Sequence, residues 1–149
     1  MFQAFAHDTV RENIQGQLLL TVKVGSTRYA QITGAYYSVF SRNQPVDRDE
    51  RAAALTGRSD SALHQILDSW LADPADNSTT VSVTDIECTS RTRATLDADL
   101  FLASTPLPDV LPLGKAVRQG GVWKVARSTF CARLTVSDPS LASRGPCAR

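Results

Sequence analysis

The sequence has almost no net charge, because 16 Lys and Arg residues are balanced by 15 Asp and Glu residues. A formal net charge of +1 gives no electrostatic basis for binding nucleic acid or an anionic membrane surface. Long apolar runs are also missing. The longest, Leu18–Val24, contains Lys23 and is far shorter than the roughly 20 residues that span a bilayer. We therefore predict no nucleic-acid partner and no membrane span within this chain.

The first residues, Met1–His7, carry no basic region, long apolar segment or small-residue cleavage site of the kind found in signal peptides. Motifs for cofactors and metals are missing too: there is no glycine-rich phosphate loop, GxSxG elbow, HExxH or CxxC, and the only histidines are His7 and His64. We therefore predict no cofactor, no metal site and no assignable catalytic residue.

The first half of the chain has helical patterns. Ser26 is a candidate N-cap for a helix that ends before Asn43 and contains Gly34, which weakens a helix by about 1 kcal/mol relative to Ala. Its apolar face consists of Tyr29, Ile32, Tyr36, Val39 and Phe40. Asp47 and Glu50 have capping-box spacing and open a short helix.

A third helix begins after Ser59 or Asp60 and ends at Asp73-Pro74. Its apolar stripe is Leu63, Ile66, Leu67, Trp70 and Leu71.

After this helix the apolar period changes from 3.6 to 2, which predicts strands. The predicted strands are Gln17–Val24, Thr79–Cys88, Arg93–Ser104, Leu113–Arg118 and Val122–Ala126, the last two joined by a Gly120-Gly121 hairpin. Thr105–Asp109 is predicted to be a connection, because its prolines cannot donate to a ladder. Ser128 is a candidate cap for a final short helix that ends at Leu134.

This order predicts an α+β fold in which about three N-terminal helices pack on a curved antiparallel sheet of four or more strands. Cystatin-like and ketosteroid-isomerase-like cones have the same order of elements. We assign residues 1–25 to an N-terminal extension with one extra strand and residues 26–149 to the α+β domain.

Two of the three cysteines, Cys131 and Cys147, enclose a short loop that cannot bury much apolar surface. A disulfide across a loop of this size contributes about 3 kcal/mol in the chain-entropy model. The spacing alone is equally compatible with a disulfide between Cys131 and Cys147 and with two separate thiols.

The segments Lys115–Val125, Ser128–Ala132 and Pro146-Cys147 resemble the C-terminal domain of the actinobacterial low-molecular-weight secreted antigen family, and the helix around Gly34 is similar to that family's opening helix. The resemblance implies a cystatin-like fold, export to the cell envelope or beyond, a Cys131–Cys147 disulfide and no assigned activity. An exported protein would need a signal or anchor outside this sequence. Residues 1–25 and Cys88 depart from the family pattern.

An enzyme of the cone-fold type, such as an isomerase, dehydratase or hydrolase, would need a carboxylate base in an apolar pocket. The candidate groups are Asp85, Asp97, Asp99, Tyr29, Tyr36, Tyr37 and His64. If Leu96 and Leu100 face the helices, however, Asp97 and Asp99 face away from them. The enzyme interpretation then rests on fold analogy alone.

The competing interpretation is a non-catalytic binding module. Asp97, Asp99 and Phe101 share the outward face of one strand, and with Trp123 they form a candidate interaction surface. We expect its partner to be an unidentified protein, a small apolar ligand or a second copy of the chain paired through the sheet. The alternative for these four residues is an ordinary solvated surface.

Overall fold

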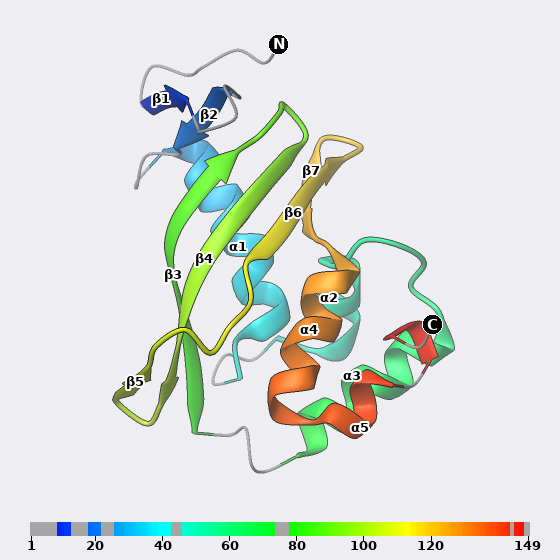
Figure 1. Cartoon of the computed structure of the whole chain (residues 1–149). Helices are drawn as coiled ribbons and strands as arrows, with labels where there is room; N and C mark the ends of the chain where they lie inside the picture. Colours follow the sequence, from blue (N-terminus) through cyan, green and yellow to red (C-terminus); the bar gives the residue numbers. More distant parts are fainter. Residues whose placement is uncertain are drawn as a thin grey trace.

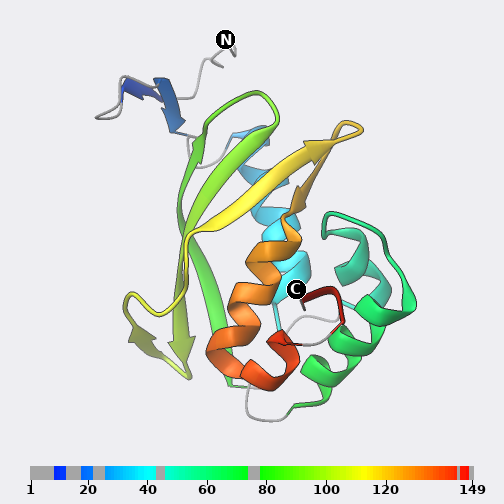
Figure 2. The ribbon, with the colours of Figure 1, turned by 45° about the vertical axis from the view of Figure 1, so that its right-hand side comes forward.

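The computed structural model describes residues 9–12, 18–21, 26–42, 46–73, 78–143 and 145–147. The fold is α+β, with an antiparallel sheet covered on one face by helices (Figures 1 and 2). The strands are β1 (Thr9–Glu12), β2 (Leu18–Thr21), β3 (Thr79–Cys88), β4 (Arg93–Leu102), β5 (Thr105–Leu107), β6 (Gly114–Gln119) and β7 (Val122–Val125). The helices are α1 (Thr27–Phe40), α2 (Arg48–Ala53), α3 (Ser61–Ala72), α4 (Arg127–Ser137), α5 (Pro139–Ala142) and the 3-10 turn η2 (Gly145–Cys147).

The strand order in the sheet is β1-β2-β3-β4-β6-β7, and β5 pairs with β4 outside this path. The two long strands, β3 and β4, pair from Thr79 opposite Leu102 to Cys88 opposite Ala94. The register shifts between Val83 and Asp85, which marks an irregularity in β3. Such bulges bend a strand and increase its twist, in keeping with the curl of the sheet around α1 in Figure 1.

Local capping explains where the first three helices begin. Ser26 Oγ accepts from Tyr29 N at 3.1 Å, and Asp47 Oδ1 accepts from Glu50 N at 2.9 Å. Asp60, rather than Ser59, caps α3 by accepting from Leu63 N at 3.0 Å. The predicted starts of α1, α2 and α3 are therefore confirmed, while Pro74 lies outside the described residues.

The core lies between the helices and the inner face of the sheet. Phe40, Trp70 and Phe130 bring together α1, α3 and α4, with ring centroids 5.6 Å apart for Trp70–Phe130 and 6.4 Å apart for Phe40–Trp70. Ile86 and Leu96 cover this cluster from the sheet and are almost completely buried. The α+β class and the curved antiparallel sheet are confirmed.

The predicted set of helices is incomplete. α4 begins after Ala126, which makes no side-chain capping bond, and runs three residues past Leu134. It packs over the same face of the sheet as α1 (Figure 2), so three N-terminal helices are only part of the helical layer. No helix in the described part of the chain has the length and apolar character needed to cross a membrane.

Two predictions about strands need correction. Thr105–Leu107 is not a plain connection, because it forms β5 and pairs antiparallel with β4, with Pro106 opposite Phe101. β5 pairs with a neighbouring strand on one side only. A proline is tolerated in such an edge strand, because its missing N–H can face away from the neighbouring strand. The predicted strand Gln17–Val24 is found only as Leu18–Thr21, and its other residues lie outside the described ranges. It pairs with β1, which was not predicted, and with β3.

Candidate ligand-binding groove

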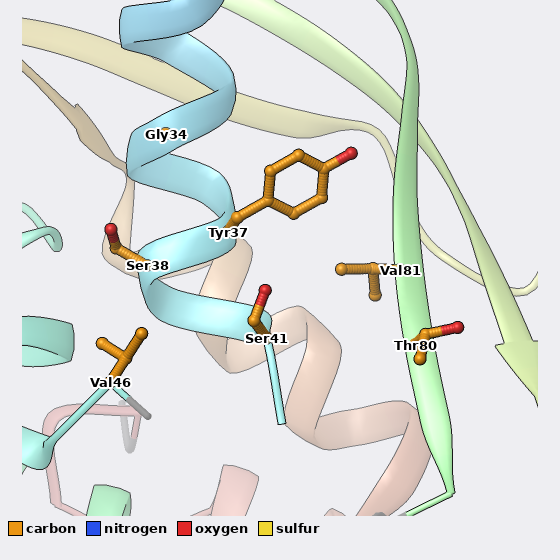
Figure 3. Close-up of a pocket in the computed structure, with 7 residues that line it drawn as sticks. All are labelled: Gly34, Tyr37, Ser38, Ser41, Val46, Thr80 and Val81. Carbon is orange, nitrogen blue, oxygen red and sulfur yellow. The ribbon is translucent and has the colours of Figure 1, made fainter. Parts of the chain in front are cut away.

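An open groove of about 480 Å³ lies between α1 and β3 (Figure 3). Its lining residues in the described part of the chain are uncharged: Gly34, Tyr37, Ser38, Ser41, Val46, Thr80 and Val81. Figure 3 shows Tyr37 extending from α1 toward β3 and Val81 extending from β3 toward the helix, while the Thr80 hydroxyl points away. The groove therefore offers an aromatic ring and aliphatic groups beside small hydroxyl-bearing side chains.

Gly34 opens one wall of this groove. A β-carbon at this position would meet no atom within 4 Å, and the backbone φ of Gly34 is not positive. Neither packing nor backbone geometry requires glycine here, although it weakens the helix by about 1 kcal/mol relative to Ala. The visible consequence of Gly34 is open space beside Tyr37 and Ser38.

Tyrosine hydroxyls fix the distance between α1 and β3. Val83 N donates to Tyr37 Oη at 2.8 Å, and Tyr29 Oη lies 3.5 Å from Val83 O as a weak donor. Both bonds reach β3 at its irregularity, where the regular ladder is interrupted. Burial, together with nearby Tyr37 and Asp85, raises the pKa of Tyr29, which keeps it a neutral donor.

The lower end of the groove is held by a buried arginine. Arg51 is 2% exposed and donates from Nη1 to Val39 O at 2.8 Å and from Nε to Val46 O at 3.0 Å. These bonds join the end of α1 to Val46, which lies just before Asp47, the N-cap of α2, and so position Val46. Burial lowers the pKa of Arg51, and nearby Arg42 lowers it further.

Arg42 supports the same region from the end of α1. Its guanidinium donates to Trp70 O, Leu71 O and Asp73 O, at 2.9, 3.1 and 3.2 Å, and so caps the C-terminus of α3. It also lies 4.9 Å from the centre of the Trp70 ring, at cation–π distance. The hydroxyls of Ser38 and Ser41 make no hydrogen bond within the described residues, and both remain available to a ligand.

The surface predicted from Asp97, Asp99, Phe101 and Trp123 is only partly assembled. Asp97 is exposed and Asp99 and Phe101 are half-buried on the outer face of β4. Trp123 is 6% exposed and belongs to the core. It shares a face of β7 with fully buried Val125, which pairs with Ala116 on the inner face. The expected exposed patch of Phe101 and Trp123 is therefore wrong.

The candidate groups for pocket catalysis do not converge. Asp85 lies opposite Asp97 in the β3–β4 register, and Asp97 is exposed rather than enclosed in a pocket. Tyr36 is 4% exposed and packs on Phe40 at a centroid distance of 4.6 Å, while His64 Nε2 lies 2.9 Å from Ser59 Oγ. Among the described residues, no group of three or more His, Cys, Asp or Glu side chains could hold a metal ion.

The disulfide implied by the resemblance is present: Cys131 in α4 is bonded to Cys147 in η2, with their Cα atoms 5.5 Å apart. Cys88 is a buried thiol on the inner face of β3. Sequence reasoning missed the groove itself. The only local signal was Gly34, an unfavourable residue inside a predicted helix.

Comparison with known proteins gives one family. The sequence profile of the low molecular weight antigen MTB12, C-terminal domain, matches residues 26–140. No curated protein matches the chain.

Proposed function

Because the chain belongs to the family of the MTB12 C-terminal domain, matched over residues 26–140, we propose that it is an exported, non-catalytic binding domain. Its ligand is a small, uncharged and largely apolar molecule with a hydrogen-bonding group, held between α1 and β3. The observation that carries this proposal is the uncharged groove of about 480 Å³, a volume typical of small-molecule sites.

The chemistry of the lining supports binding rather than proton transfer. The groove offers the faces of Tyr37, Val46 and Val81 to an apolar body, and Ser38 and Ser41 to one polar group. The described lining residues include no carboxylate or histidine, and so none of the side chains that most often act as a general base. The Tyr37 hydroxyl is already the acceptor for Val83 N.

Two observations support export. The Cys131–Cys147 disulfide is typical of proteins in oxidising compartments, and the family is described as an antigen. Within this proposal, residues 26–149 form a cystatin-like cone, and residues 1–25 are an extension that lengthens its sheet through β2.

Amide NMR spectra recorded with a library of small neutral fragments test the groove. We expect amide shifts confined to residues 34–46 and 80–83, from fragments that combine an apolar ring with one hydroxyl. Gly34→Leu should abolish these shifts, because a β-carbon at this position meets no atom within 4 Å and the rest of the side chain would occupy the open space of the groove.

The matched control is Gln31→Leu, at an exposed position on the same helix that does not line the groove. This variant should bind the fragments as the parent protein does. Shifts that persist in Gly34→Leu, or fragments that bind only elsewhere, would show that the groove is not the site.

A further inference from the structure

We propose that the ligand of the groove is an extended, uncharged peptide segment that adds to the open edge of β3 and pairs with Val81. The inference rests on the proposed binding function of the groove and names the chemical class of its ligand. It comes from the main chain of β3, because the lining side chains alone would accept many kinds of small neutral molecule.

The edge of β3 that borders the groove is open. β4 pairs along the whole of the other side of β3. On the open side, the described residues supply a strand partner only at one end, where β2 lies opposite Glu87 and Cys88 (Figure 1). This edge therefore already pairs with an extended backbone at one end, and the pairing stops before the groove.

The alternation of the β3 main chain identifies which groups point to this edge. Ser78 O accepts from Ala103 N at 2.8 Å, so Ser78 faces β4. In an antiparallel pair, successive residues direct their N–H and C=O groups to opposite sides. Val83 therefore faces the edge, and its N–H donates to Tyr37 Oη there. Val81 is two residues before Val83 in the regular part of the register, so its N–H and C=O also face the edge.

The main-chain groups of Val81 are open to a ligand. Those of Val83 are engaged by two tyrosine hydroxyls, with Tyr37 as acceptor and Tyr29 as weak donor. For Val81 N and O, the described part of the chain supplies no partner on this side. A peptide residue opposite Val81 would donate to Val81 O and accept from Val81 N. Edge groups of this kind are a template for another strand.

The two faces of β3 determine which peptide side chains fit. Residues directly opposite in a sheet have their side chains on the same face. The residue opposite Val81 would direct its side chain into the groove, as Val81 does in Figure 3, and a small aliphatic group suits that space. Its two neighbours would lie on the outer face beside Thr80 and Ser82, where cross-strand hydroxyl pairs favour threonine or serine. We therefore expect a Thr-Val-Thr pattern without charge.

A scan of main-chain methylation in a capped peptide tests strand addition on the unaltered protein. The probe is acetyl-Gly-Thr-Val-Thr-Gly-amide, and amide NMR titrations measure its dissociation constant. Methylation of the valine nitrogen should weaken binding at least about tenfold, because it removes the hydrogen bond to Val81 O and places a methyl group against the edge. Methylation of either threonine nitrogen, which points away from β3, should change the dissociation constant by less than about twofold.

Val81→Pro removes the corresponding hydrogen bond from the protein. Because the N–H of Val81 faces an open edge, proline breaks no ladder bond there and the variant should fold, which far-ultraviolet circular dichroism checks. It should bind the probe at least about tenfold more weakly than the parent chain. The matched control is Val81→Thr, which keeps the N–H and the β-branched side chain and should bind the probe as the parent does. The methylation scan does not depend on either variant.

The outcomes separate this inference from the proposed function on which it rests. If fragments with a ring and a hydroxyl shift the groove amides and the peptide does not, the inference is overturned and the proposed function stands. If neither the fragments nor the peptide shift them, both are overturned. A peptide that loses affinity equally at all three methylated positions, or that binds folded Val81→Pro as tightly as the parent chain, would also overturn strand addition.

Discussion

Tyr36 is a single residue whose ionisation is tied to the folded state. Burial raises its pKa to about 12, an effect that nearby Arg133 partly opposes. The unfolded chain releases this proton near pH 10 while the folded chain retains it. The associated stability is therefore complete below pH 10 and is lost as the pH rises from 10 to 12.

We expect the free energy of unfolding to fall by about 1.4 kcal/mol between pH 9 and pH 11 through Tyr36 alone. Urea titrations of the parent chain and Tyr36→Phe at both pH values measure this term, because the variant lacks the ionisable group but keeps the buried ring. The difference in unfolding free energy between the parent chain and Tyr36→Phe should change by about 1.4 kcal/mol between pH 9 and pH 11. Parallel pH dependence of the two proteins would contradict the expectation.

At the scale of elements, the disulfide holds the C-terminal turn to α4. Cys131→Ser/Cys147→Ser should lower the free energy of unfolding by about 3 kcal/mol, since the unfolded chain regains the entropy lost by closing a loop whose ends are 16 positions apart in the sequence. The variant should also be insensitive to reductant, whereas Cys88→Ala should lose stability with reductant as the parent does. Urea titrations with and without reductant measure both effects.

A thiol count gives an independent measurement of the same element. The denatured, unreduced chain should have one reactive thiol, and the reduced chain should have three. In the folded protein Cys88 is completely buried and should react slowly. A count of three thiols without reductant would show that the Cys131–Cys147 disulfide is absent. One of the two observations that support export would then be lost.

Helices and strands could be predicted from the sequence where the interactions that define them join residues close together in the chain. The caps Ser26, Asp47 and Asp60 act on amides three residues away, so their spacing was sufficient. Strand alternation predicts which residues share a face of a strand, but it does not predict which face is turned to the core. Trp123 was predicted to be exposed, yet it shares a face of β7 with Val125, and both side chains are buried in the core. The groove joins Gly34 to Val81 across the fold, and no local pattern contains such a pairing.

At the scale of the whole molecule, one tryptophan lies in each layer. Trp70 on α3 is completely buried against Phe40 and Phe130, and Trp123 on β7 is 6% exposed. Both belong to one continuous core cluster shared by helices and sheet. Layers that share their core in this way should unfold together in a single transition.

Single-tryptophan variants test this cooperativity. Trp123→Phe leaves Trp70 as the reporter of the helical layer, and Trp70→Phe leaves Trp123 as the reporter of the sheet. Each variant should give the same urea midpoint by fluorescence as by far-ultraviolet circular dichroism, even if the two variants differ in stability. Comparison within each variant controls for that difference. A fluorescence midpoint below the circular dichroism midpoint in Trp70→Phe would mean that the β6–β7 hairpin opens before the helices, and that the two layers are separate folding units.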